Sequence, residues 1–327
     1  MSGLIEGAKQ KIWSITNTIL DINPDAEISM ALIGYRDQGD EYVVRTHHMT
    51  EDIQGLYSNL RRFEADGGGD GPESVNEALD AAVRGQDWAE GDNVRRIIFL
   101  VGDAPPHMDY ENAPRYPKVI EAARNKDIIV NTIQAGDDPE TREYWQEIAR
   151  LGGGQYHPIP QDGGQLVQIR TPYDEQIVQI QSRIDVTILP YGSIETQAEV
   201  RGKVEERAME AAPVVADNAS YYAKKTSRKE AVTGGNDLVS DIANGDIALS
   251  EVPADELAPE LREIPEAERE AYLQSKLAER KILETEMADL VAKRDNFIEQ
   301  ETARSEDTDS FDTSVKELLN AQLSPAR

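Results

Sequence analysis

Apolar positions in the first half of the chain alternate between helical stripes and short continuous runs. Residues 2–20 have helical spacing, which predicts an amphipathic helix with one buried stripe. Residues 28–35, 96–101 and 128–133 are apolar runs of strand length, typical of strands buried on both faces. This alternation predicts an α/β fold with a doubly wound, mostly parallel sheet covered by helices. The other expected elements are a strand at 42–46, helices at 50–63, 73–86, 118–125, 139–151 and 174–184, and a hairpin of 155–159 with 166–169.

The second half has a different composition and predicts a mainly helical region over 186–327, after a first domain over 1–185. Glycine is sparse, and a helical pattern over 194–222 is broken near Pro213. A long helix is expected over 265–304, and Ser310 is positioned to cap a last short helix. Apolar residues of the long helix recur four and three residues apart, as in the seam of a coiled coil. This short seam favours either a coiled coil, through which the chain self-associates, or packing against other helices of the same chain. The seam is Leu283, Met287, Leu290, Arg294 and Phe297, and the last helix carries Val315, Leu318 and Leu319.

Charge and composition narrow the possible partners. The formal net charge is −28, so the surface repels phosphate backbones and we expect no nucleic-acid partner. The chain has no cysteine, which excludes disulfides, thiolate catalysis and cysteine-based zinc sites. There is no apolar run of membrane-spanning length, and the pattern over residues 1–20 is that of an amphipathic helix and not of a signal peptide.

Several motifs that could mark a binding or catalytic site do not predict one in this chain. The glycines at 67–69 lack the Lys-Ser/Thr of a phosphate-binding loop. His47 and His48 are adjacent on a predicted strand, so their side chains point to opposite faces and are expected to be exposed histidines of an edge strand. No nucleophile elbow or zinc-protease motif is present.

Four segments in order resemble a von Willebrand factor A domain, of the form found in bacterial and kinase-linked members. They look like the family's first helix, its second strand with the following turn, the loop before its third helix, and its fourth strand with the metal-site aspartate. The segments are Ile5–Leu20, Ala31–Asp37, Gly67–Glu73 and Phe99–His107.

The resemblance implies a metal-ion-dependent adhesion site for Mg²⁺ or Mn²⁺ at the carboxyl ends of the strands. Asp103 stands at the family's fourth-strand aspartate, and Asp70 stands where the family has a threonine. Asp37 and His107 are candidates for supporting positions beside the metal. The family's Asp-x-Ser-x-Ser motif and central first strand have no counterpart, since the first helix begins at Ser2 or Gly3. Metal binding is therefore expected to be weak or absent.

We expect that the natural protein starts upstream of Met1. The missing segment would be a strand that ends in Asp-x-Ser/Thr-x-Ser. The function implied is a non-enzymatic, adhesion-type module that binds an acidic side chain of a protein partner through the metal. Two alternatives stay open: a metal-dependent enzyme or enzyme subunit, and a structural remnant that binds no metal. The absence of cysteine and the usual location of the family's members favour a periplasmic or extracellular location. The sequence does not determine the compartment.

Overall fold

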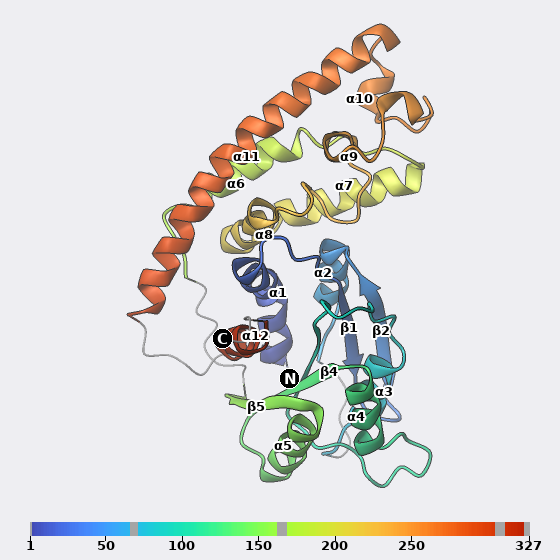
Figure 1. Cartoon of the computed structure of the whole chain (residues 1–327), viewed down its shortest axis with the longest axis vertical. Coiled ribbons are helices and arrows are strands. Elements are labelled where there is room, and N and C mark those ends of the chain that lie inside the picture. The colour runs from blue at the N-terminus through green and yellow to red at the C-terminus, as the bar shows by residue number, and fades with distance from the viewer. Residues whose placement is uncertain (1, 66–70, 162–168, 305–310, 324–327) are drawn as a thin grey trace.

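The computed structural model describes residues 2–65, 71–161, 169–304 and 311–323, and its elements form an α/β part below a helical part (Figure 1). The helix α12 of the C-terminal end lies beside α1 of the N-terminal end (Figure 1). The strands are β1 (Met30–Tyr35), β2 (Val44–Thr50), β3 (Arg96–Gly102), β4 (Ile128–Ala135) and β5 (Gly153–Ile159). The helices of the α/β part are α1 (Ser2–Ile22), α2 (Ile53–Arg61), α3 (Val75–Val83), α4 (Tyr116–Asn125), α5 (Pro139–Gly152) and α12 (Phe311–Leu323).

Strands β3, β4 and β5 form a parallel sheet with a helical layer on each face. Alternate residues of β3 point to opposite faces, as the pleat requires. Ile98 and Leu100 pack into the core made with α3, α4 and α5, whereas Ile97, Phe99 and Val101 pack toward α1 and α12. The prediction of a mixed fold with buried parallel strands is thereby confirmed in its coarse form.

Strands β1 and β2 form a separate antiparallel sheet, so the expectation of one continuous sheet is wrong for the described residues. No backbone ladder joins β1 to β3 in this part of the chain; the side-chain hydroxyl of Tyr35 instead donates a hydrogen bond to the carbonyl of Val101 at 2.8 Å. The phenol passes directly over Gly102, where any Cβ would collide with it and with Trp145. A side chain thus spans the space in which a sheet would place backbone hydrogen bonds.

Several helix and strand boundaries differ from the predicted ones. The second strand begins at Val44 instead of Tyr42 and continues to Thr50, with His47 partly buried and only His48 exposed. The helix predicted from Glu73 begins at Val75, because Glu73 forms a bridge to Pro106. The second strand of the predicted hairpin falls mostly at 162–168 and the predicted cap Ser310 falls at 305–310, and both lie outside the described residues. Val315, Leu318 and Leu319 are buried as expected.

The helical part is built around one long helix, α11 (Glu266–Thr302), as the sequence predicted. Its seam residues Leu283, Met287 and Leu290 are buried against α6 and α8 of the same chain. Among the described helices none is long and apolar enough to cross a membrane. The other helices here are α6 (Asp174–Asp185), α7 (Ile194–Ala208), α8 (Ala212–Lys224), α9 (Leu238–Asn244) and α10 (Pro259–Arg262), with a 3₁₀ turn at Leu249–Glu251.

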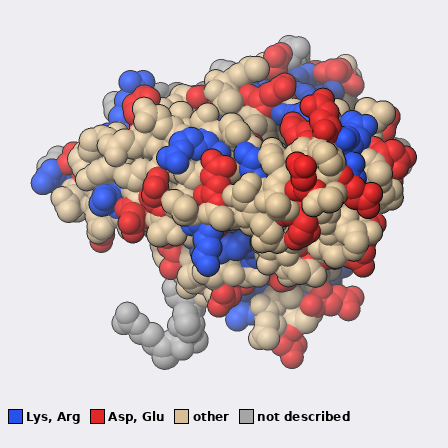
Figure 2. Space-filling model, turned by 90° about the horizontal axis from the view of Figure 1, so that it is seen from above, with Lys and Arg blue, Asp and Glu red and all other residues tan. Residues whose placement is uncertain are grey.

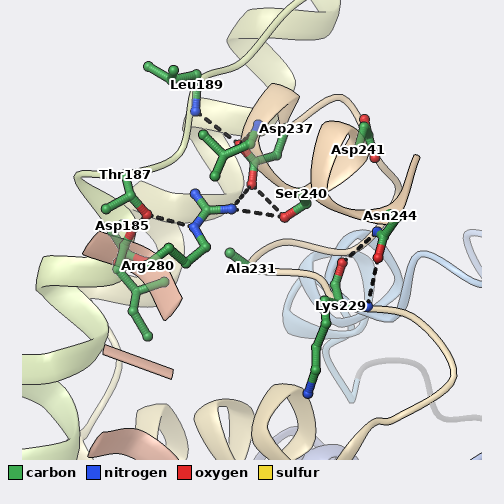
Figure 3. Close-up of polar contacts among 12 residues, drawn as sticks. Asp185, Thr187, Leu189, Lys229, Ala231, Asp237, Ser240, Asp241, Asn244 and Arg280 are labelled. Atoms are coloured by element: carbon green, nitrogen blue, oxygen red, sulfur yellow. Dashed lines mark hydrogen bonds and ion pairs between the residues drawn. The ribbon is translucent and has the colours of Figure 1, made fainter. Parts of the chain in front are cut away.

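Two buried arginines of α11 fix this packing. Arg280 is 4% exposed and pairs with Asp237 of the loop before α9; it also donates to Thr187 at 2.7 Å and to Ser240 at 2.9 Å (Figure 3). Arg294, one residue of the predicted seam, contacts Asp174 at 2.9 Å and Asp217 at 2.8 Å. These partners come from the start of α6 and from α8. The charged residue in the seam is therefore explained by acidic partners within the chain.

We expect Arg280→Ala to lower the free energy of unfolding by about 3–5 kcal/mol, because Asp237 would be left buried without its cation. Urea denaturation followed by circular dichroism measures this loss. Arg262→Ala, at an exposed position of α10, is the control and should change stability by less than about 0.5 kcal/mol. A loss in the Arg280 variant no larger than in the control would contradict a structural role for the ion pair.

Candidate functional site

The candidate site lies beyond the carboxyl ends of β1 and β3, where three loops meet. The loop before α3 joins the loop after β3 through a short parallel bridge: the Glu73 amide donates to the Pro105 carbonyl at 2.9 Å, and the His107 amide donates to the Glu73 carbonyl at 3.0 Å. The Ser74 amide donates to the carbonyl of Arg36 at 3.2 Å, which ties in the turn after β1. These backbone bonds hold together the loops that carry the acidic side chains.

Asp37 is the main acceptor of the site. The Tyr110 hydroxyl lies 2.8 Å from Oδ2 and 3.0 Å from Oδ1 of Asp37, and the Ser74 hydroxyl donates to Oδ1 at 3.2 Å. Nε2 of His107 lies 3.4 Å from Asp37 Oδ2. Groups from the loop before α3 and the loop after β3 thus converge on one carboxylate and fix its orientation.

His107 is 4% exposed and lies flat on the ring of Tyr110, with centroids 4.0 Å apart. Its Nδ1 lies 2.8 Å from the Asp109 carboxylate. The hydrogen bond from His107 lowers the pKa of Asp109. The imidazole therefore lies between two carboxylates, an arrangement in which its second nitrogen is directed at Asp37.

Glu73 is the most perturbed carboxyl of the site. Burial, followed by the negative charges of Asp37, Asp40 and Asp103, raises its pKa from 4.5 to about 7, and His107 opposes the shift. Glu73 Oε2 is buried and has no hydrogen-bond partner among the described residues. A carboxyl in this state exchanges its proton near neutral pH and favours a positively charged neighbour.

Asp103 lies at the end of β3, the position that the sequence assigned to it. The side-chain amide of Gln161 donates to its Oδ2 at 2.7 Å, and the Thr141 hydroxyl lies 3.4 Å from its backbone carbonyl. Burial together with the charges of Asp103 and Glu73 raises the pKa of the Tyr35 phenol. The Tyr35 hydroxyl therefore stays protonated and keeps its bond to β3.

Of the two metal ligands that the resemblance implies, Asp103 lies among the described residues. Carboxylate oxygens suit Mg²⁺, but within the described ranges no group of three His, Asp or Glu residues is placed to hold an ion. Asp70, one of the two predicted ligands, lies in 66–70, outside the described residues. Metal binding at this end of β3 therefore stays a prediction.

The structure brings three of the four predicted residues to one place. Asp103 and His107 lie in the loop after β3 and Asp37 in the turn after β1, with Asp37 and His107 in direct contact. Backbone bonds tie both segments to the loop before α3. Glu73 and Tyr110 were missed by the sequence analysis. Glu73 directly follows the glycine-rich loop and Pro72, and it was interpreted as the start of a helix instead of a site residue.

We expect Glu73→Gln to stabilise the protein at pH 8 but not at pH 4.5. The raised folded-state pKa means that the folded chain holds a proton which the unfolded chain releases between pH 4.5 and about 7. The contribution of Glu73 to stability is thus present below pH 4.5 and lost as the pH rises through 7. Since the carboxyl is only half-buried, solvent screening reduces the expected gain at pH 8 to about 1 kcal/mol.

The measurement is urea denaturation of both proteins across this pH range. Glu111→Gln, at an exposed position of the loop after β3, is the matched control and should show no pH-dependent gain. An equal gain in both variants would assign the effect to net charge and contradict a local origin.

The comparisons with known proteins do not assign the chain to a family. No protein-family model matches it, and no curated protein matches it. The likeness to a von Willebrand factor A domain therefore rests on the four sequence segments, with the order of the elements as its support.

Proposed function

We propose that the chain is a non-enzymatic protein-binding module whose ligand surface is the acidic end of β1 and β3. The observation that carries the proposal is the convergence of Asp37, Glu73 and Asp103 from three loops, close enough for their charges to raise the pKa of Glu73. Like charges are costly to hold together, so such a cluster is stabilised when a cationic group binds it.

The position of the cluster also supports a binding role. It lies beyond the carboxyl ends of parallel strand β3 and of β1, where α/β proteins bind their ligands. The von Willebrand factor A likeness implies a divalent cation at this end of the sheet, with a partner's acidic side chain on the cation. The described residues supply carboxylates without a complete cage, so the cation that they favour is either a weakly held Mg²⁺ or a basic side chain of the partner.

An enzyme is the second candidate, and Glu73 is the residue that favours it. A carboxyl with a pKa of about 7 is suited to accept a proton at neutral pH. The charged groups around it are Asp37, Asp40, Asp103 and His107, and the neighbouring Ser74 hydroxyl donates to Asp37 and not to Glu73. Binding without chemistry fits this arrangement better.

Calorimetric titration with Mg²⁺ tests the metal component. We expect a dissociation constant of about 1 mM or weaker, because Mg²⁺ dehydrates reluctantly and needs near-octahedral ligands. Asp103→Ala should remove the remaining binding, while Asp92→Asn, an exposed position before β3, should leave it unchanged. Micromolar binding by this chain would contradict the view that its ligand set is incomplete.

A peptide array probed at pH 8 tests the binding function. The variant Asp37→Asn/Glu73→Gln/Asp103→Asn removes three carboxylates of the site, and the control Glu90→Gln/Asp92→Asn/Glu111→Gln removes the same charge at exposed positions. We expect basic peptides to be lost from the site variant and retained by the control. Equal retention by both variants, or hydrolysis of the peptides by the parent chain, would overturn the proposed function.

A further inference from the structure

A cavity of about 70 Å³ lies in the helical part, away from the acidic site. Its walls come from α6, α8, the loop after α8, and α11. Ile184, Ala219 and Met287 give it an apolar floor that is buried in the helical core. Lys229 and Ala288 line it and are exposed, so the cavity opens to solvent on that side.

The loop wall of this cavity is held in place by contacts on both sides. The side chain of Asn244 accepts from the Lys229 amide at 3.2 Å and donates to the Lys229 carbonyl at 2.8 Å, and the Lys229 side chain extends away from this clamp (Figure 3). Arg207 donates to the carbonyl of Ala231 at 2.9 Å. A wall fixed in this way needs little ordering when a ligand binds, which lowers the entropic cost of binding.

One charged side chain of the lining is left without a hydrogen bond. Glu284, on α11, has no hydrogen bond or ion pair with any residue that the structure describes, whereas Glu230 on the opposite wall is paired with Lys225 at 2.8 Å. Burial raises the pKa of Glu284, and the charges of Arg280 and Lys229 oppose the shift. Gln181, also in the lining, donates an amide hydrogen to Asp185 at 2.8 Å, which leaves its carbonyl as a further acceptor.

We propose that this cavity binds a small primary alkylammonium ion, with the ammonium group on the Glu284 carboxylate and the alkyl chain on the apolar floor. The acceptors of Glu284 and Gln181 match the N–H donors of an ammonium group. The size limits the alkyl chain: an apolar cavity of about 150 Å³ holds the six carbons of benzene, so one of about half that volume accepts a chain of about three carbons. The formal net charge of −28 attracts a cationic ligand. Acidic side chains, interspersed with basic ones, cover much of the face shown in Figure 2.

Isothermal titration of the full chain with n-propylammonium chloride at pH 8 tests the proposal. We expect saturable binding that Glu284→Gln weakens by about tenfold or more, since the amide cannot replace the charge-assisted bond. Asp289→Asn, an exposed carboxylate on the same helix outside the cavity lining, should leave the affinity unchanged. Tetramethylammonium chloride at the same ionic strength has no N–H donor and should not bind.

A second variant tests the cavity independently of the charge. Ala288→Leu adds a larger side chain at the exposed mouth, where it does not disturb the core, and should also weaken propylammonium binding. The urea midpoint of each variant establishes that it is folded. No saturable binding by the parent chain, or equal affinity in the parent and the folded Glu284→Gln variant, would overturn the proposal.

Discussion

Buried charge on α11 is the constraint on which the helical part depends. A guanidinium removed from water is tolerated only where acceptors surround it, and removing its partner costs far more than the pair itself contributes. Arg280 and Arg294 meet this requirement at two points along one helix, through Asp237 before α9 and through Asp174 and Asp217 of α6 and α8. Each pair is directional, so the two together fix the rotation and the register of α11. Apolar packing of Leu283, Met287 and Leu290 alone would leave that register less defined.

The same principle operates where the helical part meets the α/β part. Lys203 of α7 is buried and lies 2.6 Å from Asp52, the residue that caps α2. The backbone amide of Gln54 donates to the Thr233 hydroxyl at 2.9 Å, and its side chain donates to the Lys203 carbonyl at 2.6 Å. Helix α2 packs on β1, so polar contacts from the helical part indirectly support the strand that leads into Asp37. The loops of the acidic site are thus held by their own backbone bonds and, through α2 and β1, by contacts with the helical part.

The two proposed binding regions differ in physical character. At the ends of β1 and β3, carboxylates lie close together on the surface of the α/β part, and their mutual repulsion is the feature that a ligand would relieve. In the helical part, Glu284 lies at the side of an apolar cavity, and there a carboxylate without a described cationic partner and the buried floor act together. The first region suits a group presented by a protein partner, and the second suits a small molecule. Neither region uses the residues of the other.

The sequence by itself determined the elements, because the period of apolar residues reports local geometry: the buried strands at 96–101 and 128–133 and the long helix at 265–304 all follow from it. It also placed Asp37, Asp103 and His107 near one end of the sheet, since the carboxyl ends of neighbouring strands meet there. Only the tertiary structure decided that β1 and β3 are connected through Tyr35 instead of a backbone ladder, because pairing between strands depends on contacts 66 residues apart. It also decided the role of Glu73, whose raised pKa comes from burial and from charges on other loops. Periodicity carries no information on either, since both arise from groups distant in the chain.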